Sequence, residues 1–261
     1  VYEGPYQKWK PESDKPVNFL SVIKADQLSK IEITAAGQTT ALEKSGEKWK
    51  IGGTKGFYVA EATASYLNDK LKQAIDSDLE IASQVKEKQS SFTTDEAAGI
   101  NVKLYQGDSQ VANFYVGKMG SDYNSTYISP ANSSMTYLVG ANLYNAFNPG
   151  DWYDKSIVAV AEDKISKIRF QYPNREFAIE KKGENWEGTA PRKVTVKAEK
   201  VTELLNLFSS VMADSIPEQK FDGTGLDKNL IIVQVTGEGV NETVMVGTAN
   251  KDGKYFAKKA N

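Results

Sequence analysis

The sequence predicts an α+β fold made of two related units, each an antiparallel sheet with one principal amphipathic helix. Three observations predict it. The 261-residue chain can be laid over itself at an offset of 137 residues, which brings Leu28 onto Ile165. Each copy contains short segments of alternating apolar and polar residues separated by turns, as antiparallel strands do. Each copy also has one helical apolar stripe, and strands grouped around a single helix indicate α+β rather than a parallel doubly wound sheet.

The predicted organisation has four parts, of which the first is polar and rich in proline. They are an extended lead-in over 1–20, a first α+β repeat over 21–142, an inter-repeat linker over 143–160 and a second, C-terminally short repeat over 161–261.

The strands that open each repeat match at the common offset. Two blocks carry the match, and each pairs an apolar–polar alternation with its copy: Leu28–Ile31 with Ile165–Ile168, and Leu42–Trp49 with Ile179–Trp186. The second block contains Ser45-Gly46 in one copy and Lys182-Gly183 in the other, which predict a tight turn between two strands.

One helix follows in each repeat, at the same offset. Its apolar positions are spaced by three and four residues: Ala60, Ala64, Leu67, Leu71 and Ala74, then Val201, Leu204, Phe208 and Val211. This spacing places the apolar side chains on one stripe of a helix. We expect Trp49 and Trp186, which end matched strands, to pack beneath these helices.

Later segments match at offsets that drift with loop length. The pairs are Gly99–Asn101 with Gly225–Asp227, Phe114–Gly117 with Val244–Gly247, and Tyr127–Ser129 with Tyr255–Ala257. Another strand, Met135–Val139, is predicted only in the first repeat, because the second reaches Asn261 without a counterpart.

Composition excludes several chemistries. The chain has no Cys and no His, so disulfides, thiolate nucleophiles, Ser–His–Asp triads and imidazole metal ligands are ruled out. Carboxylate sites for calcium or magnesium and carboxylate-pair catalysis remain open. The net charge is −2 and the pI about 5.5, which argues against a nucleic-acid partner. No apolar run reaches the roughly 18 residues that a membrane span needs.

The repeat consensus resembles the bacterial domain of unknown function 4340. The residues that carry the resemblance are the strand Leu28–Ile33, Trp49 and Trp186 after their Gly turns, Gly225–Asp227, and the segment Asp151–Val158 between copies. One position departs from the pattern, since Gly99-Ile100-Asn101 stands where Gly-Leu-Asp is expected. The resemblance covers about residues 20–261 and implies no catalytic residues.

The resemblance also implies a cellular setting. Members of this family typically follow an N-terminal membrane helix and are often encoded beside ABC-transporter components of the gliding-motility type. The chain begins with Val1 rather than Met, and we expect a processed or excised form. The expected location is therefore extracytoplasmic, periplasmic or at the cell surface, with a tether supplied by an N-terminal segment outside this sequence.

No motif predicts a catalytic, cofactor or metal site, and none of these is expected. Ser-x-x-Lys occurs three times without the Lys-Thr-Gly that accompanies it in penicillin-interacting enzymes. Asp222-Gly223-Thr224-Gly225 lacks the ligand spacing of a calcium loop and predicts a turn. The remaining candidates are Trp152 and Tyr153 in the linker, either as contacts for a protein partner or as core packing.

The expected function is a non-enzymatic protein-interaction module in a membrane complex, accessory to an ABC-transporter-linked assembly. Two alternatives stay open. A carbohydrate- or polymer-binding module would use exposed aromatic rings, and a hydrolase would use a pair of facing carboxylates in a cleft.

Overall fold

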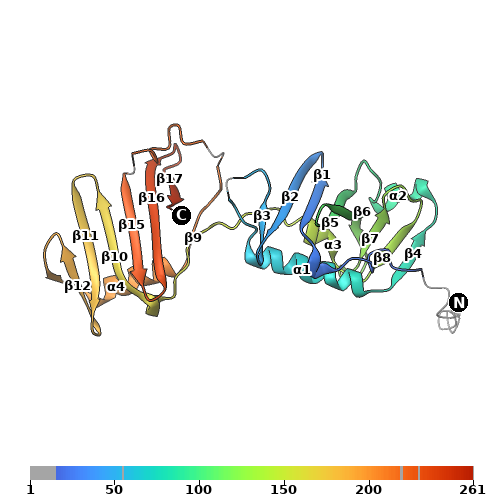
Figure 1. The fold of residues 1–261 in the computed structure, drawn as a ribbon. Coiled ribbons are helices and arrows are strands. Elements are labelled where there is room, and N and C mark those ends of the chain that lie inside the picture. Colours follow the sequence, from blue (N-terminus) through green and yellow to red (C-terminus); the bar gives the residue numbers. More distant parts are fainter. Residues whose placement is uncertain (1–15, 55, 218–219, 229, 261) are drawn as a thin grey trace. The chain divides into compact units, whose positions relative to one another are not determined.

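The computed structural model describes residues 16–54, 56–217, 220–228 and 230–260, so most of the predicted lead-in lies outside the described residues. The chain divides into two compact units between Asp154 and Lys155. Each unit has one antiparallel sheet and one principal helix, and the predicted α+β fold is confirmed. Figure 1 shows the first unit in blue to green and the second in yellow to red.

The first unit is built on an eight-stranded sheet with the order β3-β2-β1-β5-β6-β7-β8-β4. Its strands are β1 Lys30–Ala35, β2 Gln38–Ser45, β3 Lys48–Ile51, β4 Leu79–Ser83, β5 Ile100–Gln106, β6 Ser109–Met119, β7 Thr126–Pro130 and β8 Thr136–Val139. Its helices are α1 Glu61–Asp76, α2 Gln89–Phe92 and α3 Leu143–Phe147, with the 3-10 turns η3 Ala25–Gln27 and η4 Lys86–Lys88.

Alternation along the strands and the stripe on α1 together form the core of this unit. In β1 the side chains of Ile31 and Ile33 are buried, while those between them face the other side of the sheet. On α1, Leu67 and Leu71 are buried against the same face. We call this the inner face of the sheet, and the opposite one the outer face.

The second unit has a seven-stranded sheet with the order β13-β12-β11-β10-β15-β16-β17 and a separate pair, β14-β9. Its strands are β9 Ser156–Val158, β10 Ile165–Tyr172, β11 Arg175–Lys182, β12 Asn185–Ala190, β13 Val194–Thr195, β14 Val211–Met212, β15 Ile231–Gly237, β16 Val240–Ala249 and β17 Tyr255–Lys259. Its helix is α4 Ala198–Ser209, and η5 Glu162–Lys164 is a 3-10 turn.

The two sheets share strand order and register. The run β3-β2-β1-β5-β6-β7 in the first unit corresponds to β12-β11-β10-β15-β16-β17 in the second. Lys30 lies opposite Glu43 in one hairpin, and Lys167 lies opposite Glu180 in the other, at the predicted offset of 137 residues. The helices α1 and α4 begin at matching positions, Glu61 and Ala198.

A repeated glycine marks where the chain crosses the outer face of each sheet. An ideal Cβ at Gly117 on β6 would lie 2.2 Å from the carbonyl oxygen of Phe92. One at Gly247 on β16 would lie 2.0 Å from the carbonyl oxygen of Thr224. Only glycine permits this approach of two backbones, which accounts for its recurrence in both repeats.

The units differ after β7 and β17. The strand predicted only in the first repeat is present as β8, and it is followed by α3, which packs on α1 and β6. Leu143, Ala146 and Phe147 of α3 are buried in the core of the first unit, although they belong to the segment predicted as a linker. No described helix combines the length and apolar character needed to cross a bilayer.

Candidate functional site

Trp152 and Tyr153 lie beside the chain that leads into α1. The backbone N–H of Ala60 donates to the carbonyl of Trp152 at 2.9 Å, and the N–H of Asp154 donates to the carbonyl of Tyr58 at 2.8 Å. Tyr153 is paired with Val59 in an antiparallel bridge. These backbone bonds hold residues 152–154 against the start of the principal helix of the first unit.

The side chains of both residues are half-buried and pack against the core of the first unit. The ring of Phe57 meets that of Tyr153 edge to face at 5.7 Å between centroids. Tyr58 is 36% exposed, and the ammonium of Lys48 lies 5.9 Å from the centre of its ring. We refer to Phe57, Tyr58, Trp152 and Tyr153 as the aromatic cluster.

Phe57 and Tyr58 were not among the residues predicted for this site. They directly precede the predicted helix, and their distance of about a hundred residues from Trp152 leaves no local signal that joins them. Two adjacent aromatic residues before a helix were the only available hint. The tertiary pairing of residues 152–154 with 58–60 brings the two aromatic pairs together.

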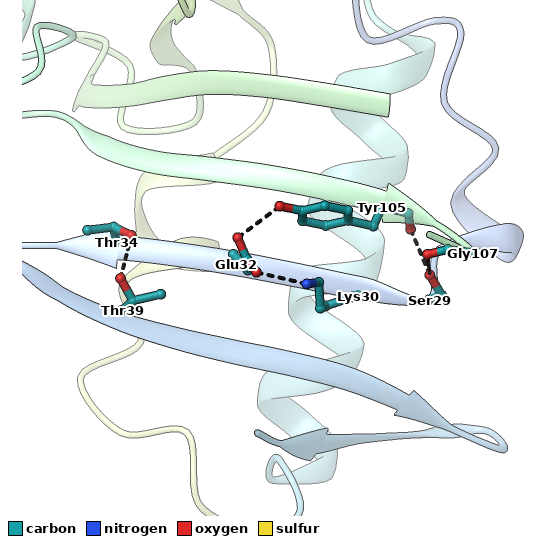
Figure 2. A network of polar contacts seen from close by, with 7 residues as sticks. All are labelled: Ser29, Lys30, Glu32, Thr34, Thr39, Tyr105 and Gly107. Carbon is teal, nitrogen blue, oxygen red and sulfur yellow. Dashed lines mark hydrogen bonds and ion pairs between the residues drawn. The ribbon is translucent and has the colours of Figure 1, made fainter. Parts of the chain in front are cut away.

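A second polar feature lies on the outer face of the first sheet (Figure 2). The Nζ of Lys30 is 2.8 Å from Oε1 of Glu32, and the hydroxyl of Tyr105 donates to Oε2 of Glu32 at 2.9 Å. The Lys30 ammonium also lies 4.2 Å from the centre of the Tyr105 ring. The three residues come from neighbouring strands β1 and β5, which place alternate side chains on this face.

The network changes the acidities of its members. The hydrogen bond from Lys30 lowers the pKa of Glu32 below its usual value, and the Tyr105 hydroxyl adds to this effect. The same bond to Glu32 raises the pKa of Lys30. Burial raises the pKa of Tyr105, as does its bond to Glu32. Glu32 is therefore held in the ionised form, which does not favour a role as a general acid.

The outer face of the second sheet carries the equivalent positions with different charges. Lys167 corresponds to Lys30, and Arg169 stands where the first unit has Glu32. Arg169 forms an ion pair with Glu176 at 2.6 Å and donates to Gln234 at 2.9 Å. Together with Thr236 these residues line a shallow, open hollow.

The groups in this hollow bind one another. Arg169 is matched by Glu176, which lowers the pKa of that carboxyl, and Lys167 lies 3.9 Å from Glu180. Partly exposed ion pairs across neighbouring strands contribute modestly to stability. The arrangement therefore favours a stabilising ladder on the sheet over a ligand site.

The other motifs singled out in the sequence lie in turns. Ser45 and Lys48 are opposite each other at the end of the exposed β2–β3 hairpin. Asp222–Gly225 forms the turn that precedes the contact with Gly247, and Thr224 accepts a hydrogen bond from the N–H of Thr248 at 2.8 Å. Within the described ranges, no three Asp or Glu side chains gather in a group able to hold a metal ion.

These features define a tandem α+β protein whose two units share strand order and register but differ in the elements that complete them. The model of the family "Domain of unknown function (DUF4340)" matches residues 49–229, and the chain belongs to this family. The match runs from Trp49 in the first unit to the outer-face crossing in the second. No curated protein and no solved structure matches the chain significantly.

Proposed function

We propose that this chain is a non-enzymatic protein-interaction module that acts outside the cytoplasm, accessory to an ABC-transporter-linked membrane assembly. The location and the assembly rest on what the family resemblance implies. The protein-contact role rests on the aromatic cluster of the first unit, and specifically on the presence of Trp152 and Tyr153 at its surface.

The cluster has the chemistry of a contact site. Trp and Tyr are enriched at the centres of protein interfaces because they bury a large area and lose little side-chain entropy on binding. Trp152 and Tyr153 are half-buried, so the fold already holds one side of each ring in place. A partner that covers the remaining surface would meet a preorganised site, and preorganisation lowers the cost of binding.

Photo-crosslinking in cells that naturally make the protein tests this role. A photoreactive phenylalanine analogue replaces Tyr58, which belongs to the cluster and is 36% exposed. The matched control carries the analogue at Tyr123, an aromatic residue of the same unit that is 72% exposed. We expect a discrete protein adduct from position 58 and no such adduct from position 123.

Two outcomes would contradict the proposal. Equal labelling from both positions would show that the cluster is not a preferred contact. A carbohydrate adduct at position 58, together with saturable binding of cell-wall glycans by the purified chain, would favour the carbohydrate- or polymer-binding module. That alternative uses the same rings, since aromatic side chains also stack on sugars.

A further inference from the structure

The first unit shows how this fold is completed after its sixth shared strand. β8 pairs with β7, so that Thr126 lies opposite Val139 and Ile128 lies opposite Tyr137. The far edge of β8 pairs with β4. The chain then forms α3 on the inner face, where the rings of Phe147 and Phe114 meet edge to face at 6.2 Å.

The second unit has the same sheet without these elements. β17 corresponds to β7 and is the last strand of its sheet, and in the described part of the chain no strand pairs with its free edge. Ile216 stands at the position of Leu79 in β4, but it lies outside any strand. The strands that correspond to β7 and β4 are thus not bridged by a strand like β8.

The burial of matched residues differs accordingly. Ile128 on β7 is fully buried, whereas Ala257 at the same position of β17 is exposed. Val116 on β6 is 1% exposed, whereas Val246 at the same position of β16 is half-buried. The inner face of the second sheet is therefore partly open where β8 and α3 cover the first.

The backbone of β17 is also available. The N–H of Ala260 donates to the carbonyl of Thr243 on β16 at 2.9 Å. Backbone groups of alternate residues point to opposite sides of a strand, so those of Lys258 face β16 and those of Ala257 and Lys259 face the free edge. An added strand would find donors and acceptors already aligned there.

We propose that the second unit binds an extended segment of a partner protein, which adds as a strand to β17 and lays apolar side chains on the open inner face. This is recognition by strand addition, in which the backbone supplies affinity and alternate side chains supply specificity. The segment β8–α3 of the first unit shows which residue types fit: an alternating strand followed by a short helix with a large aromatic residue.

Charge favours a partner over a second copy of the chain. The turn before β17 and the strand itself carry Lys251, Lys254, Lys258 and Lys259 against one acidic residue, Asp252. Pairing of two β17 strands would bring these lysines together, and like charges on neighbouring strands are destabilising. A partner strand with acidic residues on its solvent side fits this edge. The inference goes beyond the function proposed for the aromatic cluster and does not depend on it.

A peptide of residues 134–148, which contains β8 and α3, serves as the probe in trans. Fluorescence anisotropy of the labelled peptide measures its affinity for the whole chain, and hydrogen exchange locates the binding site. We expect saturable binding with new protection of the amides at 257 and 259. A second peptide with Leu138→Glu, on the outer side of the added strand, should bind more tightly at low salt than at high salt.

Two variants at one position provide the matched comparison. Ala257→Pro removes an N–H that points to the free edge, and an edge strand tolerates proline there. It should weaken peptide binding about tenfold, the loss expected of one good backbone hydrogen bond. Ala257→Val keeps the N–H and should bind as the natural chain does. Because the exchange experiment uses the natural chain, a folding defect in the proline variant would not remove the test.

Several results would overturn the inference. They are the absence of saturable binding, protection outside β16 and β17, or equal binding by the two Ala257 variants. A dimer in sedimentation that Ala257→Pro abolishes would instead identify a second copy as the occupant. Tyr58 variants should leave peptide binding unchanged, which separates this inference from the role of the aromatic cluster.

Discussion

Trp49 and Trp186 occupy equivalent positions in the two units, yet their environments differ. Trp49 is 2% exposed, and its Nε1 donates to Oδ1 of Asn68 on α1 at 3.1 Å. Trp186 is half-buried, and the residue at the position of Asn68 is Leu205, which offers no acceptor. The expectation that both lie beneath their helices therefore describes Trp49 better than Trp186.

Replacing Trp49 with Ala should lower the free energy of unfolding by about 3–5 kcal/mol, as expected for a large buried aromatic residue. Trp186→Ala should cost roughly half as much, because less apolar surface is withdrawn from water there. Guanidinium titrations of the two variants and the natural chain measure the difference. Equal losses would contradict the environments described here.

Glu32→Gln tests the electrostatics of the outer-face network. The pKa of Glu32 is lowered in the folded chain, so its contribution to stability is present above the ordinary carboxyl pKa and is lost as the pH falls through the folded value. The variant should be less stable than the natural chain by about 0.5–1 kcal/mol near neutral pH, as for a partly exposed pair. The difference should shrink toward about pH 3.

Unfolding titrations at several pH values measure this trend. A gap between Glu32→Gln and the natural chain that stays constant from neutral to acidic pH would show that the loss has another cause. Tyr105→Phe, which removes one donor to Glu32 but keeps the ring beside Lys30, should show a smaller gap with the same sign.

At the scale of elements, the crossing of the outer face depends on a glycine in each sheet. Gly117→Ala should destabilise the first unit by about 1–3 kcal/mol or more, because the added methyl group meets the backbone of Phe92 and neither strand nor crossing segment can yield freely. Gly247→Ala should act likewise in the second unit, against the backbone of Thr224.

Gly140 provides the control for these substitutions. A Cβ there would lie 3.8 Å from Oγ of Ser77, an ordinary contact, so Gly140→Ala should change stability by less than about 0.5 kcal/mol. Thermal unfolding of the three variants gives the comparison. A tolerated Gly117→Ala would mean that the crossing segment does not approach β6 as closely as described.

At the scale of the whole molecule, the two units have separate cores that share no residue. The first core includes α3 and the segment around Leu20, whereas the second is smaller and leaves its inner face partly open. Because buried apolar surface dominates stability, the second unit should unfold at a lower denaturant concentration than the first.

Hydrogen exchange with mass spectrometry at rising guanidinium concentrations resolves the two units. Amides of β10, β11 and β15 should lose protection before those of β1, β2 and β5. Simultaneous loss of protection in both sheets would show that the units unfold as one cooperative body. The equivalent strands act as internal controls for each other, because they have the same position and register.

The repeat and its register were readable from the sequence. β2 and β11 span Gln38–Ser45 and Arg175–Lys182, and the offset of 137 residues relates both ends of the two strands. This succeeded because alternation, turn glycines and helical spacing are local signals that each segment carries in itself. The strand unique to the first repeat was also predicted for this reason.

Burial was decided only by the tertiary structure. The aromatic cluster exists because residues 152–154 pair with 58–60, and no local pattern encodes that pairing. Ile128 and Ala257 hold the same place in equivalent strands, but one is covered by β8 and α3 and the other is open. A sequence determines which face of a strand is apolar, whereas the exposure of that face depends on which distant elements pack against it.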